Sequence, residues 1–61
     1  MFTIEGNCII FKDINGDVVK LRFSAVDMVV TKGINSEITL KCGIQVHANA
    51  QIGHIIRQHM V

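Results

Sequence analysis

Asp13, Asn15 and Asp17 place carboxylate or amide oxygens at every second position, which is how a calcium loop begins. A loop of the EF-hand type also requires a glycine at its sixth position and a bidentate acid at its twelfth. Counted from Asp13, these two positions hold a valine and a serine. Asn15 is followed by Gly16, and this pair is a strong signal for a tight hairpin turn. The segment therefore predicts a turn rather than a calcium site.

The histidines and cysteines are the residues that could hold zinc or form a nucleophile. His54 and His59 are five positions apart on a predicted helix, whereas zinc-binding pairs on a helix share a face at spacings of three or four. A composite site of Cys42, His47 and one helical histidine stays open as an alternative. No local signature pairs either cysteine with a histidine as a thiol nucleophile. We therefore expect no cofactor, no metal and no catalytic residue, and so no enzyme.

β-Branched residues are frequent in the first two thirds of the chain, and this composition favours strands. A bend is expected at Ser24-Ala25, where the alternation of apolar residues slips. The predicted strands cover residues 2–13, 17–23, 26–32, 37–42 and 44–48. The fold class expected from this order is α+β and mostly β, with a small antiparallel β-sheet built from hairpins and followed by one C-terminal helix.

The last part of the chain changes its period. Ile52, Ile55, Ile56 and Met60 recur at i, i+3, i+4 and i+8, which is one face of a helix. Asn49 precedes this stretch and is a good N-cap, because its side chain can accept a hydrogen bond from an unpaired amide of the first turn. A glycine within the stretch, at position 53, could let the helix approach the sheet closely.

The size of the chain bears on association. Its 61 residues, 49% of them hydrophobic, are expected to form one domain over residues 1–61. A domain this small buries only about 60% of the surface that its unfolded chain exposes. Two cysteines cannot make a disulfide framework, so association is the expected remedy. No apolar run is long enough to span a membrane and no signal peptide is visible, so a cytoplasmic location is expected.

A type I′ turn at Asn15-Gly16 would fix the register of the hairpin around it. It would place Lys12 opposite Val19 and Ile10 opposite Leu21. The face assigned to the core carries Cys8, Ile10, Ile14, Val19, Leu21 and Phe23. The opposite face carries Ile9, Phe11, Val18, Lys20 and Arg22.

One helix covers only one side of a sheet, and the opposite face holds more apolar surface than a solvated face usually does. We therefore predict that Ile9, Phe11, Val18, Lys20 and Arg22 contact a second copy of the chain or another protein. The alternative is a sheet curled into a small barrel, which would bury both faces.

Nucleic acid is a second class of partner to weigh. The six Lys and Arg residues are spread along the chain and the net charge is +1, whereas nucleic-acid-binding proteins usually carry a basic cluster. In the predicted register, however, Phe11 shares a surface with Lys20 and Arg22, and cations beside an aromatic ring can bind phosphate and stack bases. Binding of nucleic acid, or of a small anionic ligand such as a nucleotide, is therefore kept as the alternative function.

The order of features resembles the FlbD/SwrD family of small flagellar accessory proteins over about residues 9–60. The resemblance is carried by Asn15-Gly16 after the first strand, by Val26 and Val29, by Ile38-Thr39-Leu40, by Gly43, and by Ile52, Ile55 and Ile56. The chain departs from the family at Cys42-Gly43, where a second Asn-Gly is common. The resemblance implies a non-enzymatic accessory protein that acts through protein contacts. With the size argument, it predicts a small regulatory or adaptor protein that forms a homodimer or higher oligomer and binds a protein partner.

Overall fold

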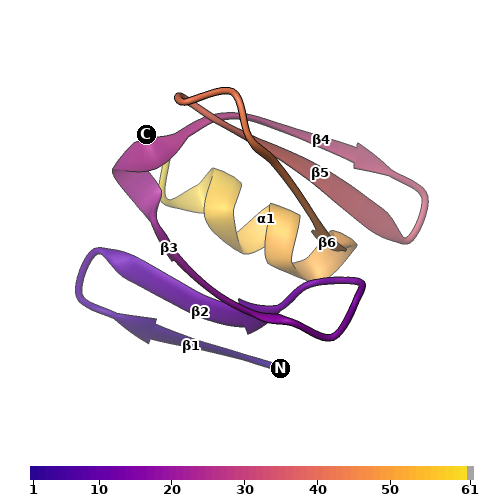
Figure 1. Ribbon diagram of the computed structural model, residues 1–61, viewed down its shortest axis with the longest axis horizontal. Coiled ribbons are helices and arrows are strands. Elements are labelled where there is room, and N and C mark those ends of the chain that lie inside the picture. Colours follow the sequence, from indigo (N-terminus) through magenta and orange to yellow (C-terminus); the bar gives the residue numbers. More distant parts are fainter. Residues whose placement is uncertain (61) are drawn as a thin grey trace.

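The computed structural model describes residues 1–60 as two three-stranded antiparallel sheets and one C-terminal helix (Figure 1). The first sheet, in the order β1-β2-β3, consists of β1 (Phe2–Glu5), β2 (Cys8–Lys12) and β3 (Val18–Arg22). A short 3₁₀ turn, η1 (Phe23–Ala25), leads into the second sheet, which consists of β4 (Val26–Lys32), β5 (Asn35–Leu40) and β6 (Gln45–Asn49). Helix α1 (Ala50–Gln58) follows. The expected α+β, mostly β fold class is confirmed, and η1 is the bend expected at Ser24-Ala25.

Helix α1 lies between the two sheets (Figure 1) and packs on the inner face of β4, β5 and β6. Both sheets and the helix contribute to one cluster of buried residues. The cluster consists of Ile9, Phe11, Leu21, Phe23, Val26, Val29, Ile38, Ala48, Ile52 and Ile56. No helix within residues 1–60 is long and apolar enough to cross a membrane.

The long first strand predicted over residues 2–13 is in fact a hairpin. Glu5 pairs with Cys8, and Gly6 and Asn7 form the two-residue turn between β1 and β2. Gly6 has a φ of 56° whereas Asn7 does not have a positive φ, which is the pattern of a type II′ turn. The prediction missed this turn because the apolar run from position 8 onward was joined to the strand before it.

The loop between β2 and β3 corrects the predicted register. The Gly16 N–H donates to the Asp13 carbonyl oxygen (3.0 Å), so the tight turn is centred on Ile14 and Asn15. Gly16 alone has a positive φ, 84°, and Asn15 does not have the positive φ that a type I′ turn requires. Lys12 therefore pairs with Val18 instead of Val19.

This slip of one residue reverses the two faces of β2, because side chains alternate along a strand. Ile9 and Phe11 are 0% and 3% exposed and belong to the core, so their assignment to an exposed face is wrong. Cys8 and Ile10 are half-buried, and Ile14 is exposed, so their assignment to the core is wrong as well. Strand β3 keeps the predicted orientation.

The contact between α1 and the second sheet depends on two small residues. A Cβ atom added at Gly53 would overlap the Ser36 hydroxyl oxygen and lie 2.6 Å from the Ser36 Cβ. Gly53 therefore allows the close approach that the sequence predicted. The helix begins as predicted too, because the Asn49 side chain accepts a hydrogen bond from the Ile52 N–H (2.9 Å).

Candidate partner-binding face

The outer face of the first sheet, turned away from the core, is the strongest candidate for a binding site. Strand pairing places Ile10 between Thr3 and Lys20, and Lys12 beside Val18. We call this surface the basic face. Its residues are Thr3, Glu5, Cys8, Ile10, Lys12, Val18, Lys20 and Arg22.

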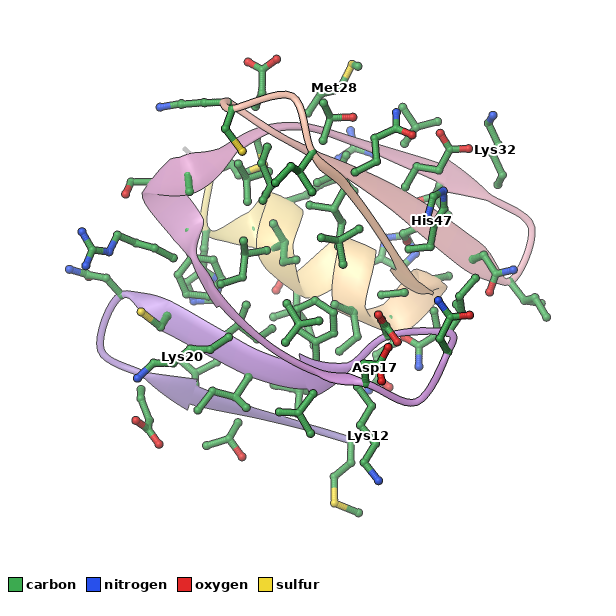
Figure 2. All side chains as sticks on the ribbon, in the orientation of Figure 1. Lys12, Asp17, Lys20, Met28, Lys32 and His47 are labelled. Carbon is green, nitrogen blue, oxygen red and sulfur yellow. The ribbon has the colours of Figure 1, made fainter. Side chains whose placement is uncertain are left out.

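Three cations dominate the charge of the basic face. Lys12, Lys20 and Arg22 are all exposed, and they are half of the six Lys and Arg residues of the chain. None of them forms an ion pair within residues 1–60, where the one salt bridge joins Lys32 to Glu37. Lys12 and Lys20 project away from helix α1 (Figure 2). The face therefore offers positive charge that the described part of the chain does not neutralise.

An apolar groove opens at one end of the basic face. Its volume is about 340 Å³, and its lining is Met1, Phe2, Thr3, Ile10, Phe11, Lys12 and Val18. Val18 is 68% exposed, although it is a valine within a strand. The surface thus combines a recess for an aliphatic side chain with a lysine at its rim.

Three of the five predicted contact residues come together on this face: Val18, Lys20 and Arg22. The other two, Ile9 and Phe11, lie on the opposite face in the core. Sequence reasoning missed Lys12, which takes their place beside Val18. A signal was present, because the predicted register put this lysine on the core face, where lysines are rarely found.

None of the residues of the basic face is aromatic, and the two phenylalanines that line the groove at its end, Phe2 and Phe11, are not exposed. The chain has three phenylalanines and neither Tyr nor Trp. Phe11 and Phe23 are buried, and Phe2, paired with Phe11, is half-buried on the inner side of the sheet. Phe11 therefore does not share a surface with Lys20 and Arg22, and the predicted arrangement for binding a base and a phosphate is wrong.

The acidic loop after β2 is organised by one carboxylate. Oδ1 of Asp13 accepts hydrogen bonds from the backbone N–H groups of Asn15 (2.9 Å) and Asp17 (3.0 Å). This arrangement closes a turn on itself, as Asp side chains often do in loops. Within residues 1–60 no three His, Cys, Asp or Glu side chains gather as a metal site would require, and so Cys42, His47 and a helical histidine do not come together.

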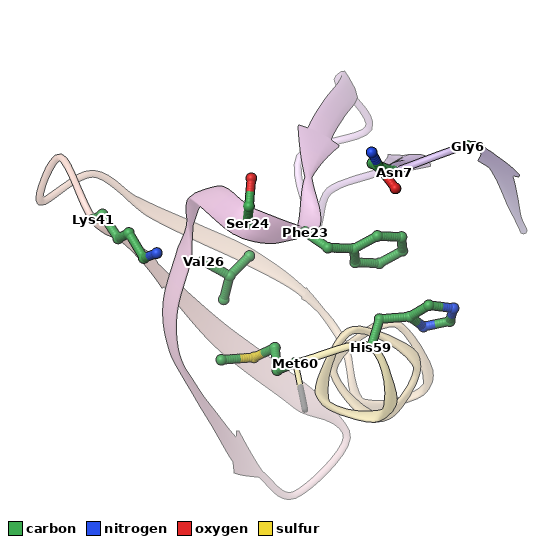
Figure 3. A pocket seen from close by; sticks show the side chains of 8 residues that line it. All are labelled: Gly6, Asn7, Phe23, Ser24, Val26, Lys41, His59 and Met60. Atoms are coloured by element: carbon green, nitrogen blue, oxygen red, sulfur yellow. The ribbon is translucent and has the colours of Figure 1, made fainter.

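A second groove, of about 510 Å³, lies where η1 meets the end of α1 (Figure 3). The ring of Phe23 stacks on that of His59, with centroids 4.3 Å apart and planes 7° apart. The His59 Nδ1 lies 2.9 Å from the Ile55 carbonyl oxygen. Because a carbonyl oxygen can only accept, Nδ1 is the donor in this contact.

Ser24 lines this groove together with His59, so a serine and an imidazole share one recess. A nucleophile and its base must lie within hydrogen-bonding distance, and none of the side-chain hydrogen bonds in residues 1–60 joins these two. The stacked pair instead holds the end of α1 against η1.

No family model, curated protein or solved structure matches the chain. The resemblance to the FlbD/SwrD family therefore stays a prediction.

Proposed function

We propose that the chain is a non-catalytic regulatory or adaptor protein that self-associates and binds an acidic protein partner through the basic face. The observation that carries the proposal is the set of three exposed cations, unpaired within residues 1–60, beside an apolar groove. Charges that lack an internal partner are available to a binding partner, and complementary charge contributes mainly to specificity and to the rate of association.

The spacing of the cations fits an extended segment. Lys20 and Arg22 are alternate residues of β3, so their Cα atoms are about 7 Å apart. Alternate side chains of an extended peptide have the same spacing. An acidic residue at every second position of the partner could thus face each cation, while an aliphatic side chain enters the groove beside Lys12 and Val18.

A protein fits this surface better than a nucleic acid does. Single-stranded nucleic acids are bound by aromatic side chains together with a basic groove, and the basic face has no exposed aromatic. An apolar recess also contributes nothing to phosphate binding. At protein interfaces, in contrast, a few residues seated in desolvated pockets carry most of the affinity, and arginine is frequent among them.

The test is a titration of a fluorescent peptide that alternates glutamate with valine and carries one leucine at its end. We expect the double substitution Lys20→Glu and Arg22→Glu to weaken binding by about tenfold or more, because two attractive charge pairs become repulsive. Lys41→Glu is the matched control, since Lys41 is exposed and lies in the other groove. Equal weakening by the control would contradict the proposal.

An oligonucleotide of mixed sequence serves as the second probe. Tighter binding of the oligonucleotide than of the peptide, with an affinity that falls steeply as salt rises, would replace the protein partner by a nucleic acid. Far-UV circular dichroism of each variant verifies that the fold is retained.

A further inference from the structure

Strand β4 has the free edge best suited to pairing with another chain. Each three-stranded sheet has two edge strands, β1 and β3 in the first sheet and β4 and β6 in the second. An edge strand presents unpaired N–H and C=O groups, which are a template for a further strand. The four edges differ in length, in charge and in what already occupies them.

Three of the edges are poor templates. β1 is only four residues long. β3 carries Lys20 and Arg22, and charged side chains on an edge oppose pairing. The open edge of β6 is already engaged, because the Ile14 N–H donates to the His47 carbonyl oxygen (3.0 Å).

β4 is the longest strand, with seven residues, and its centre from Met28 to Thr31 is uncharged. The two-residue loop after Lys32 makes Lys32 and Asn35 a hydrogen-bonded pair, so Val30 also directs its N–H and C=O toward β5. The backbone N–H and C=O groups of Val29 and Thr31 then point to the open edge of β4. No loop or turn hydrogen bond of residues 1–60 reaches these groups.

The surface beside this edge is apolar. Met28 and Val30 lie on the outer face of the second sheet and are 51% and 37% exposed. Met28 projects away from helix α1, on the side of the molecule opposite to Lys12 (Figure 2). Burial of these two side chains would add apolar contact to the backbone hydrogen bonds of a paired edge.

We infer that β4 pairs antiparallel with β4 of a second copy, which would join two three-stranded sheets into one of six strands. The inference rests on the self-association part of the proposed function. Residues that oppose each other across the pair must lie on the same face of the joined sheet, so the twofold axis passes through a residue and not between two. The two central residues of the uncharged stretch are Val29 and Val30. With the axis through Val29, Met28 of each copy lies opposite Val30 of the other; with the axis through Val30, the two Val30 side chains are opposed and each Met28 lies opposite Lys32.

The charges at the ends of β4 favour the antiparallel direction. Asp27 lies near one end and Lys32 at the other. Antiparallel pairing brings Asp27 of one copy to the same end as Lys32 of the other, one residue out of register for either axis, whereas parallel pairing in register would align like charges. A register shift between Val26 and Met28 disrupts the strand at its beginning and limits pairing to the centre. The twofold contact uses both β4 edges, so it closes as a dimer rather than a fibre.

The first test is the mass of the protein in solution as a function of concentration, measured by analytical ultracentrifugation. We expect a dimer for the wild-type chain and an increase of at least about tenfold in its dissociation constant for Val30→Lys, because a like charge then lies across or beside the twofold axis. Ile44→Lys is the matched control, since Ile44 is exposed in the turn between β5 and β6. A wild-type monomer at all concentrations, or equal effects of the two variants, would overturn the inference.

The second test uses disulfide formation. Cys8 and Cys42 are free thiols, so both are first replaced by serine. In that background, Val30→Cys would cross-link if the axis passes through Val30, and the pair Met28→Cys and Val30→Cys would cross-link if it passes through Val29. Ile44→Cys measures the rate of chance encounters. Cross-linking of both β4 variants no faster than that of Ile44→Cys would overturn the inference.

The double variant Lys20→Glu and Arg22→Glu separates this inference from the partner-binding proposal. We expect it to remain dimeric, because the basic face and the β4 edge belong to different sheets. Loss of the dimer in this variant would contradict the assignment to β4. A protein that is monomeric but still binds the acidic peptide would refute the β4 pairing and leave the basic face in place.

Discussion

The two sheets have the same number of strands, but they differ in how they contact the helix and in whether the charges on their outer faces are paired. The second sheet packs its inner face on α1 through the contact of Gly53 with Ser36, and its outer face neutralises charge in the Lys32–Glu37 salt bridge (3.0 Å). The first sheet shares the same core but leaves Lys12, Lys20 and Arg22 without an ion pair in residues 1–60. The second sheet thus holds the helix, and the first presents positive charge that the described residues do not neutralise.

The sheets also differ in what sets their strand pairing. In the second sheet, the two-residue turn Gly33-Ile34 pairs Lys32 with Asn35. In the first sheet, the five-residue loop from Asp13 to Asp17 decides which residues of β2 face the core. The register of the first sheet therefore depends on a five-residue loop, whereas that of the second sheet is set by a two-residue turn.

The largest effect on the free energy of unfolding is expected from substitutions that compare the two faces of β2. Ile9→Ala removes a fully buried side chain and should lower the free energy of unfolding by about 2–5 kcal/mol. Ile10→Ala trims a half-buried side chain on the basic face and should lower it by about 1 kcal/mol or less. Urea unfolding followed by far-UV circular dichroism measures both, since the chain lacks Trp and Tyr. The type I′ register would reverse the order of the two effects.

A chain of this size has a total stability of roughly 3–9 kcal/mol, so Ile9→Ala can unfold it outright. Ile9→Val and Ile10→Val then provide the comparison, with a cost of about 0.5–1.5 kcal/mol for the buried position. Equal costs at the two positions would argue against the observed register.

An intermediate effect should come from the contact of the second sheet with α1. The Cβ atom of Gly53→Ala would overlap Ser36, and such overpacking costs about 1–3 kcal/mol. Alanine regains about 1 kcal/mol of helix propensity, so a net loss of up to about 2 kcal/mol is expected. Urea unfolding of Gly53→Ala, of Ser36→Gly and of the double variant gives the coupling free energy between positions 53 and 36. Stabilisation by Gly53→Ala alone would show that the helix does not approach the sheet so closely.

The smallest effect should come from the loop of the first sheet. Gly16→Ala places a side chain at a φ of 84° and should cost about 1 kcal/mol, all of it conformational because no atom lies within 4 Å of the added Cβ. Asn15→Ala should change the free energy of unfolding by only a few tenths of a kcal/mol, since Asn15 does not have a positive φ. Thermal and urea unfolding compare the two. A type I′ turn would instead make both substitutions costly.

Most of the second half of the chain was predictable from local patterns. Strand β4 occupies the predicted residues 26–32, and the helix begins after Asn49. β5 begins at Asn35, two residues earlier than predicted, because the turn before it is tighter. The half of the basic face that lies on β3 was also predictable, since Val18, Lys20 and Arg22 alternate with Val19 and Leu21, which turn inward.

The half of the face that lies on β2 was not predictable from local pattern. Cys8, Ile9, Ile10 and Phe11 are consecutive apolar residues, so either alternate pair can face a core. The register depended on the turn, and Asn15-Gly16 suits both a two-residue turn and the longer loop in which Gly16 alone has a positive φ. The hydrogen bonds of Asp13 within the loop are what distinguish them.

The sequence by itself determined the kinds of elements, because the i, i+3, i+4 spacing of Ile52, Ile55 and Ile56, the N-cap Asn49 and the β-branched strands are local properties. Only the tertiary structure decided that Ile9 and Phe11 are core and that Lys12 lies on the basic face. The reason is that a strand alternates with a period of two, so one residue in a loop exchanges its faces, and the free energy of packing against α1 and the second sheet selects between them.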